Sequence, residues 1–435
     1  MPCHGHDRAD RSAVSPLVDS SGCGPHPRPV LSISRPWGSF MPFSVYALGL
    51  AVFAQGTSEF MLSGLLSGIS ADLHVSIPAT ALLTSAFAVG LVIGAPLMAL
   101  LGRNWPRRRA LLFFLCVFAA VHVIGAVTSS YGLLFATRVV GALANAGFWA
   151  VALVTAVALA GPGARARATS VVVGGVTVAC VAGVPAGAWL GGQWGWRAAF
   201  WAVALVSLPT IAVIAAAIPA GRPPSALPSA RAELRSLSGR GLRLTLLTSA
   251  LVQGATFCAF SYLEPIATQV TGFGSVWVPV LLALFGVGSF IGVTVCGRGI
   301  DSRPIALTAA GLVALALGWA LFACTAGSPA AVVVLVLVQG MLAFGTGTAL
   351  ISHVFRLADG APTLAGSFAT AAFNVGGALG PWIGGLAIGA GYGFRAPLWV
   401  STLLMALALG AAGAAWACRP APEPATVPEG APGSG

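Results

Sequence analysis

The segments FAVGLVIG (residues 87–94) and FGVGSFIG (residues 285–292) lie 198 positions apart and share a Phe, a Val and two Gly residues in one register. The same shift places Gln55-Gly56 on Gln253-Gly254 and Pro106 on Pro304. It also places Gly187, Gly191, Gly195, Arg197, Ala198 and Trp201 on Gly385, Gly389, Gly393, Arg395, Ala396 and Trp399. Matches of composition alone would not keep one register over five apolar runs, so the chain is predicted to consist of two similar halves.

The composition predicts a membrane protein. Hydrophobic residues make up 57% of the chain and charged residues only 8%, whereas soluble domains average about 25% charged residues. A helix that spans a bilayer needs about 20 apolar residues. We find twelve such runs, near residues 43–66, 79–101, 110–128, 132–158, 168–192, 198–218, 243–266, 276–296, 305–326, 329–353, 364–388 and 396–417.

The placement of arginine predicts the orientation of these runs. The chain has no Lys, and fourteen Arg residues lie in the loops that follow even-numbered runs. Only Arg197 and Arg395 lie in the loops that follow odd-numbered runs. Because cytoplasmic loops carry an excess of positive charge, both termini are expected in the cytoplasm. The repeat shift spans an even number of runs, so both halves should have the same orientation, with a cavity between them.

We therefore predict an all-α polytopic membrane protein with twelve transmembrane helices in two pseudo-symmetric six-helix halves. The predicted organisation is a disordered N-terminal extension at residues 1–41, an N-terminal half at 42–218, a cytoplasmic linker at 219–242, a C-terminal half at 243–418 and a disordered tail at 419–435. The net charge of +11 is spread between apolar runs and does not form one basic domain, so no nucleic-acid partner is expected.

Two charged residues deep in apolar runs are the main candidates for a functional site. The segment AQGTSEF (residues 54–60) carries Glu59, and the fourth run carries Arg138. A charge inside a membrane indicates function by default. On a helix, Gln55, Glu59 and Ser63 share one face. Arg138 shares a face with Asn145, and both charges are predicted at a similar depth. Glu59 could carry a proton or pair with Arg138, and the sequence leaves both options open.

Other polar residues in the apolar runs are weaker candidates for a cavity lining. Gln253, Phe257 and Ser261 form the matching face of the seventh run. Gln339, Thr346 and Asn374 are further candidates. His122 is interpreted as a hydrogen-bonded packing residue, and Glu264 as a residue at headgroup level or at the cavity mouth.

Four motifs give the chain a resemblance to the major facilitator superfamily over roughly residues 42–418. GRGIDSRP (297–304), with Asp301 and Arg303, resembles the cytoplasmic loop motif of this family. LGRNWPRRR (101–109) departs from that motif, because Arg103 occupies the position equivalent to Asp301. ATRVVGALANAGF (136–148) resembles the motif of the fourth span, whose Arg points into the cavity. GVPAGAWLGG (183–192), with Gly183, Pro185 and Gly187, resembles the antiporter motif of the fifth span.

Several segments are similar to the bacterial chloramphenicol-resistance exporters of the drug:proton antiporter group. They are FAQGTSEFMLSGLL, LTSAFAVGLVIGAPLMAL, WPRRRALL, VVGALANAGF and GVPAGA. The resemblance implies proton-coupled efflux of a small neutral antibiotic, most simply chloramphenicol, with Glu59 and Arg138 in proton coupling. An exporter of a sugar or an endogenous metabolite is the alternative within the superfamily. A membrane enzyme and a non-transporting sensor are more distant alternatives.

Expectations about partners and cofactors follow from the same reading. The chain contains no GxxxxGK[ST] motif, no nucleophile elbow and no Cys/His ligand set in its apolar runs, so neither enzymatic activity nor a cofactor or metal is expected. The expected partners are a drug substrate, protons as the coupling ion and the lipid bilayer. We expect a monomer in the bacterial cell membrane, with several membrane passes.

Overall fold

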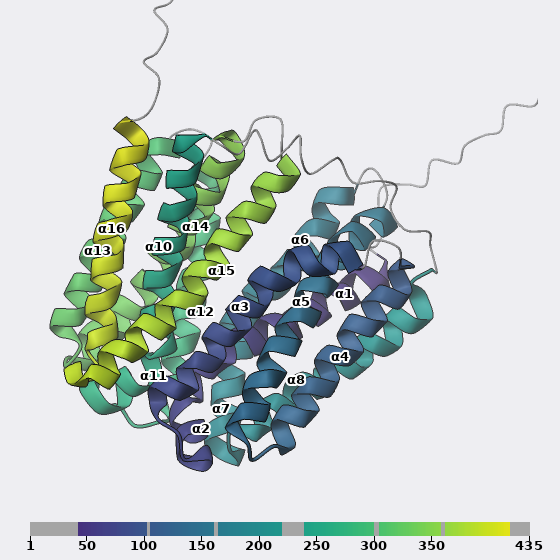
Figure 1. The fold of residues 1–435 in the computed structure, drawn as a ribbon, viewed down its shortest axis with the longest axis horizontal. Helices are drawn as coiled ribbons and strands as arrows, with labels where there is room; N and C mark the ends of the chain where they lie inside the picture. Colours follow the sequence, from purple (N-terminus) through teal and green to yellow (C-terminus); the bar gives the residue numbers. More distant parts are fainter. Residues whose placement is uncertain are drawn as a thin grey trace, which may run out of the picture. The chain divides into compact units, whose positions relative to one another are not determined.

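The structure is a computed structural model that describes residues 42–101, 105–160, 164–219, 239–299, 304–357 and 362–417. These residues form helices joined by short turns and contain no strand (Figure 1). Among the described residues, twelve helical segments are long and apolar enough to cross a membrane, as the sequence predicts. The cytoplasmic loop motif residues Arg103, Asp301 and Arg303 lie outside the described residues, as do residues 1–41, most of the linker and the C-terminal tail.

The helices of each half follow the order of the apolar runs. The first half contains α1 (Phe43–Phe60), the 3₁₀ turn η1 (Met61–Gly64), α2 (Leu66–Leu73), α3 (Ile77–Leu101), α4 (Arg107–Val127), α5 (Tyr131–Ala160), α6 (Arg165–Val178), the π-helical η4 (Ala179–Gly183), α7 (Val184–Trp194) and α8 (Arg197–Ala217). The second half contains α10 (Arg240–Ser261), α11 (Leu263–Pro265), the π-helical η5 (Ile266–Thr271), α12 (Trp277–Gly299), α13 (Pro304–Thr325), α14 (Pro329–Leu357), α15 (Pro362–Ala387), the π-helical η6 (Ile388–Tyr392) and α16 (Ala396–Ala417).

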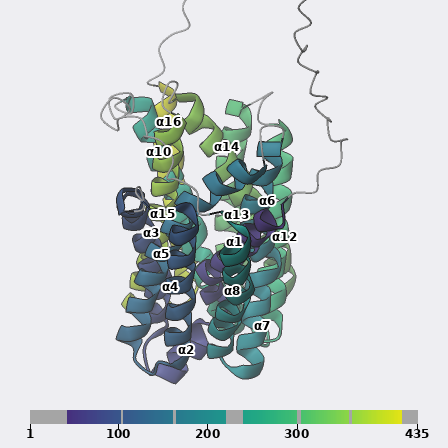
Figure 2. The same ribbon diagram turned by 90° about the vertical axis from the view of Figure 1, so that its right-hand side faces the viewer.

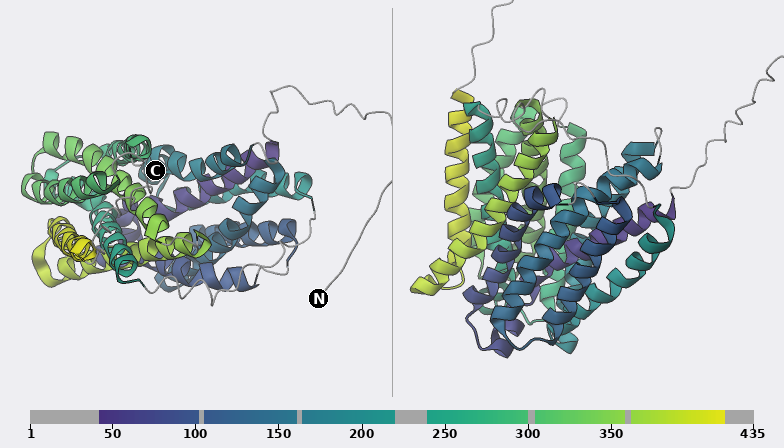
Figure 3. Two further views of the ribbon diagram at one scale, coloured as in Figure 1. Left: turned by 90° about the horizontal axis from the view of Figure 1, so that it is seen from above. Right: turned by 45° about the vertical axis from the view of Figure 1, so that its right-hand side comes forward.

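Each half has its own apolar core. One cluster of buried side chains draws only on residues between Val45 and Ile218. The other draws mainly on residues between Val252 and Ala408, with six side chains contributed by the first half. Figure 3 shows the helices of the first half, in purple to teal, gathered on one side, and the green and yellow helices of the second half on the other; in Figure 2 the first half lies in front of the second. This separation agrees with the repeat in the sequence, while the limits of the predicted domains remain predictions.

The two halves meet through two equivalent pairs of helices. In the first pair α3 packs along α15, as Figure 1 shows. In the second pair α12 packs on η4 and α7. A shift of 198 residues carries α3 onto α12, and it carries the η4–α7 segment onto α15. The duplication in the sequence therefore appears as a two-fold pseudo-symmetric interface.

The fifth span departs from α-helical geometry where its proline requires it. Pro185 lies in the first turn of α7 and has no N–H to donate to the residue four positions earlier. The span widens into the π-helical turn η4 immediately before this position. A Cβ at Gly183 would lie 2.0 Å from the Thr57 Oγ1 of α1, so only glycine permits this approach of the first and fifth spans.

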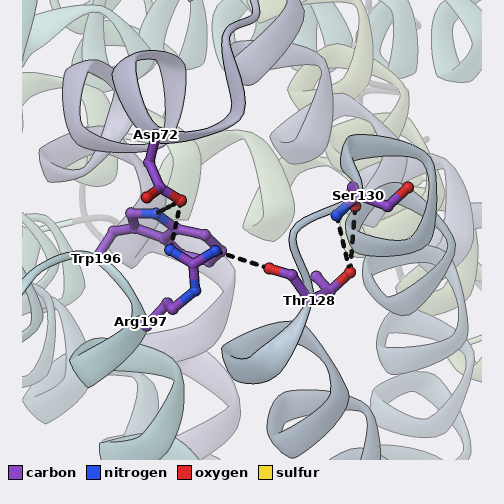
Figure 4. Close-up of polar contacts among 5 residues, drawn as sticks. All are labelled: Asp72, Thr128, Ser130, Trp196 and Arg197. Atoms are coloured by element: carbon purple, nitrogen blue, oxygen red, sulfur yellow. Dashed lines mark hydrogen bonds and ion pairs between the residues drawn. The ribbon is translucent and has the colours of Figure 1, made fainter.

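The short helix α2 is fixed to its own half by a polar cluster (Figure 4). Asp72 forms an ion pair with Arg197 at the start of α8, and Trp196 Nε1 donates to Asp72 Oδ2 over 3.2 Å. Arg197 Nη2 also donates to the Thr128 carbonyl oxygen over 2.9 Å, in the turn between α4 and α5. The hydrogen bond from Arg197 holds the pKa of Asp72 below its usual value. We call this end of the helices, where α2 and α11 lie, the α2 end.

Candidate functional site

Arg138 on α5 is buried and bound to the end of α1. Its side chain is only 2% exposed. Nη1 donates to the Ser58 hydroxyl oxygen and Nη2 to the Ser58 carbonyl oxygen, each over 2.8 Å. Ser58 lies in the last turn of α1, where carbonyl groups lack a helical partner. The guanidinium carbon lies 4.3 Å from the centre of the Phe87 ring of α3, which covers one face of the cation.

His122 on α4 completes this arrangement. The Ser58 Oγ and His122 Nε2 atoms are 2.6 Å apart, and His122 Nδ1 lies 2.7 Å from the Phe118 carbonyl oxygen. A carbonyl oxygen can only accept, so Nδ1 carries the proton and Nε2 accepts the Ser58 hydroxyl proton. The ring packs against Phe118 and Phe200, with centroid distances of 4.2 and 5.7 Å. The chain Arg138–Ser58–His122–Phe118 is therefore satisfied with a neutral imidazole.

Glu59 follows Ser58 in the chain but takes no part in this set of hydrogen bonds. Its side chain is partly buried, and within the described part of the chain it has no hydrogen bond and no ion pair. It nevertheless lies within electrostatic range of Arg138 and of the Cys180 thiol on η4. Similar depth for the two charges was expected from the sequence. The structure adds that Arg138 is bound to Ser58 while Glu59 is left without a direct partner.

A pocket lies between the two halves beside this region. Its lining comprises Phe60, Cys180 and Val184 from the first half and Thr256, Phe257, Phe260, Phe285 and Phe344 from the second. Phe60 and Phe257 contact each other across the two halves, with ring centroids 5.5 Å apart. Phe60, the residue that follows Glu59, lines the pocket, so this turn of α1 lies next to an aromatic site, although Glu59 itself is not one of the lining residues.

Several polar atoms in the predicted cavity residues are buried without a hydrogen-bond partner. These are both amide atoms of Gln55, the Oδ1 of Asn145, the Oγ of Ser261, the Oε1 of Gln339 and the Oγ1 of Thr346, in residues that are at most 3% exposed. Ser63 is also buried, but its hydroxyl donates to the Phe60 carbonyl oxygen over 3.1 Å. Unpaired polar groups in an apolar interior are costly, so such positions are candidates for substrate contacts.

The remaining predicted cavity residues are spread more widely. Phe257 lines the pocket, and Gln253 on the same helix is partly buried. The structure places Gln339 against α13, where Nε2 donates to the Leu315 carbonyl oxygen over 3.4 Å. Thr346 also faces α13, near Gly311. Asn374 donates to the Thr370 carbonyl oxygen of its own helix. Of all the predicted cavity residues, Phe257 is the one that lines this pocket, while Gln339 lines a second pocket with Trp319 and Phe322.

The antiporter-motif residues lie where the fifth span meets α1. Gly183 faces Thr57, and a Cβ at Gly187 would lie 3.3 Å from the Met61 Cβ. Pro185, which lies between these two glycines in the sequence, is also buried. The motif therefore sets the distance between α1, which carries Glu59, and η4, which carries Cys180.

Comparison with known proteins places the chain in a family. A model described as "Major Facilitator Superfamily" matches residues 48–371. The chain belongs to this superfamily. Over 372 residues it is 50% identical to the "Chloramphenicol resistance protein" of Streptomyces lividans, covering 85% of this chain and 95% of the relative. It is 33% identical over 368 residues to the "Inner membrane transport protein YdhP" of Escherichia coli (strain K12), covering 84% and 94%.

Solved structures of superfamily transporters share the fold. A crystal structure of a bacterial homolog to the human lysosomal transporter Spinster, inward-facing and occupied, has a TM-score of 0.69 at 17% identity and covers 87% of this chain and 98% of that one. The human organic anion transporter MFSD10 has a TM-score of 0.61 at 20% identity, covering 85% and 97%. The predicted fold class and the predicted resemblance to chloramphenicol-resistance exporters are thereby confirmed, and the chain is a multi-pass membrane protein of a transporter family.

Proposed function

We propose that this protein exports a small neutral antibiotic, chloramphenicol, in exchange for protons, by alternating access between its two halves. The observation that carries the proposal is Glu59, an intramembrane carboxyl group that forms no hydrogen bond and no ion pair among the described residues and directly precedes Phe60, which lines a pocket between the halves. The chloramphenicol resistance protein of Streptomyces lividans, 50% identical over nearly its full length, supports the choice of substrate.

The chemistry of the pocket suits such a solute. Chloramphenicol combines an aromatic ring with hydroxyl and amide groups and carries no charge. Five Phe side chains of the pocket offer apolar faces for the ring. Outside the lining of this pocket, Gln55, Asn145 and Ser261 carry unpaired polar atoms, which are hydrogen-bonding groups of the kind that orient a ligand. A cationic drug would call for more carboxylates than the single deep one found in the described spans.

Proton exchange requires Glu59 to be protonated in one stage of the transport cycle and ionised in the other. An ionised carboxylate in an apolar interior is stable only when water or a cation accompanies it, whereas a protonated carboxyl group needs neither. When the protein changes its access from one side of the membrane to the other, Glu59 would therefore carry a proton in one direction and none in the other. Arg138 provides a counter-charge within electrostatic range when the proton leaves. The protein would then bind the drug in its pocket and the proton on Glu59 alternately, and not both at once.

The proposal also fixes orientation and assembly. Because positive charge accumulates on the cytoplasmic side, both termini would be cytoplasmic and the α2 end would face the outside of the bacterial cell membrane. Each half supplies part of one pocket, so a single chain suffices for transport and we propose a monomer. No cofactor is required, since the proton gradient would supply the driving force.

Accumulation of labelled chloramphenicol in a sensitive bacterium without its own exporters tests this function. Cells that express the protein should hold less drug than cells that express Glu59→Gln at the same membrane level. A protonophore should abolish the difference. Accumulation in both strains at the level of cells without the protein, with a normal pH gradient, would contradict the proposed substrate while leaving the fold unaffected.

A further inference from the structure

We propose that Ser58 and His122 are positioning residues that hold Arg138 away from Glu59, and so set the pH at which Glu59 releases its proton. The inference rests on the proposed proton coupling at Glu59. Neither residue lines the pocket, and among the described residues neither forms a hydrogen bond with the Glu59 carboxyl group. These two residues determine how readily the Arg138 guanidinium group can pair with the Glu59 carboxylate.

The geometry shows Arg138 committed to one of two neighbouring acceptors. Two of its nitrogens donate to Ser58, over 2.8 Å each, although Glu59 is the next residue. Arg138 Nε remains buried and without a partner. A guanidinium group normally prefers a carboxylate, because charge-assisted hydrogen bonds are about twice as strong as neutral ones. Binding to Ser58 instead is the arrangement expected when Glu59 is protonated and neutral.

His122 makes Ser58 a better acceptor. The Ser58 hydroxyl gives its own proton to His122 Nε2 over 2.6 Å, and donation of this kind strengthens the oxygen as an acceptor for Arg138 Nη1. The Phe118 carbonyl oxygen keeps the imidazole proton on Nδ1 and so keeps Nε2 free to accept. Without His122, the Ser58 hydroxyl would lose its acceptor inside the protein, and Arg138 would be held less firmly.

The two acceptors then compete for one cation. When Glu59 loses its proton, its carboxylate attracts Arg138, and the bonds to Ser58 oppose that movement. Stronger binding to Ser58 leaves the carboxylate less stabilised, so Glu59 keeps its proton up to a higher pH. Weaker binding has the opposite effect. The groups that interact electrostatically with Glu59 are Arg138 on α5 and Cys180 on η4, and His122 on α4 interacts with Arg138.

Infrared titration of the purified protein in lipid tests this directly, because it follows the protonated carboxyl band of Glu59 without any drug or transport. The band is assigned by its loss in Glu59→Gln. Two variants weaken the arrangement in different ways. His122→Phe keeps an aromatic ring between Phe118 and Phe200 but removes the acceptor. Ser58→Ala removes the hydroxyl group and keeps the backbone carbonyl.

Both variants should shift the midpoint of the Glu59 band to lower pH by about half a unit to one unit, the amount that one hydrogen bond contributes. Their shifts should not add in the double variant, because they act through the same link. His122→Gln restores an acceptor and should titrate closer to the wild-type protein. Ser207→Ala is the matched control, since Ser207 is a buried serine whose hydroxyl donates to the Val203 carbonyl oxygen of its own helix over 2.8 Å.

The outcomes separate this inference from the function on which it rests. A Glu59 band that titrates at the same pH in wild type, His122→Phe and Ser58→Ala would overturn the positioning role and leave proton coupling intact. A shift to higher pH would overturn it as well. If no Glu59 band titrates even in the wild-type protein, both the inference and the proposed proton coupling fail. Should His122→Phe not fold, Ser58→Ala provides the same comparison alone.

Discussion

Adjacent residues in the first span have different surroundings. Ser58 is fully buried and binds both Arg138 and His122, whereas Glu59 is partly buried and forms no hydrogen bond with any described residue. Successive side chains on a helix point about 100° apart, so neighbours in sequence can face a neighbouring helix and a cavity respectively. This division lets one turn of α1 carry both the proposed proton site and the group that holds its counter-charge.

Asp72 provides a prediction about pH at the scale of one residue. Its pKa is lowered by Arg197, so the ion pair stabilises the folded protein above the pKa of an unfolded Asp, near 4, and that stabilisation is lost as the pH falls toward the lower folded value. We expect Asp72→Asn to lower the melting temperature slightly at pH 7, because exposed pairs contribute little. In detergent, the difference from wild type should shrink below about pH 4. An equal difference at pH 3 and pH 7 would contradict the assignment.

At this scale the sequence indicates the charges but not their partners. Glu59 and Arg138 stand out because charge is rare in apolar runs. The partners of Arg138 depend on helix rotation and packing over 80 residues of separation, which local patterns do not specify. His122 is a hydrogen-bonded packing residue, as predicted, but its link to Arg138 through Ser58 is visible only in the structure. Phe260, Phe285 and Phe344 were not candidates because Phe is equally common in packed cores.

At the scale of elements, α2 connects the two halves. Its second residue, Ser67, donates its backbone N–H to Glu264 Oε2 on α11 over 3.0 Å. The first N–H groups of a helix have no helical partner, and its N-terminus favours negative charge. Glu264 is only 8% exposed, so its carboxyl group is buried where α11 meets α2. Asp72 fixes the other end of α2 to the first half.

We therefore expect Glu264→Gln to open the α2 end more readily. Cys180 lines the pocket and is 8% exposed, so its labelling reports access to that site. In intact cells, with Cys180 as the sole cysteine, an impermeant maleimide should label Glu264→Gln faster than the parent. Asp72→Asn is the control, because it loosens α2 only from its own half. Equal labelling rates in Glu264→Gln and the parent would contradict a closing role for Glu264.

The sequence predicts which segments form helices, but it does not predict where these helices depart from α-helical geometry. All twelve spans follow from apolar length. The first predicted span, 43–66, ends instead in the 3₁₀ turn η1 and is followed by α2, whose mixed sequence LSGISADL gives no periodic signal. The π-helical turn η4 could be suspected from Pro185 but not located, since the bond that a proline removes can be replaced in several ways.

At the scale of the whole molecule, the duplication predicts where the halves touch. Ala88 on α3 and Gly377 on α15 face each other, and a Cβ built on Gly377 would lie 3.8 Å from the Ala88 Cβ. This separation suits a disulfide. In a cysteine-free background, Ala88→Cys with Gly377→Cys should cross-link on oxidation, lose transport and regain it with a reductant. Ala88→Cys with Val375→Cys should not cross-link, since Val375 is exposed.

Failure of the first pair to cross-link would contradict the packing of α3 on α15. A cross-linked protein with undiminished transport would show that the halves need not move apart at this interface. The sequence alone predicts that the two halves are related by symmetry, because residues 198 positions apart match. It does not predict how closely α3 and α15 approach each other.

Proteoliposomes with an imposed pH gradient test whether Glu59 carries the coupling proton. Wild-type protein should accumulate labelled chloramphenicol against its concentration gradient, and Glu59→Asp should retain part of this activity. Glu59→Gln should insert normally and exchange drug for drug, yet fail to accumulate drug uphill. If Glu59 were only the structural partner of Arg138, Glu59→Gln with Arg138→Gln should recover accumulation, because no unpaired charge would remain; we expect no recovery. Uphill accumulation by Glu59→Gln at the wild-type rate would contradict the claim.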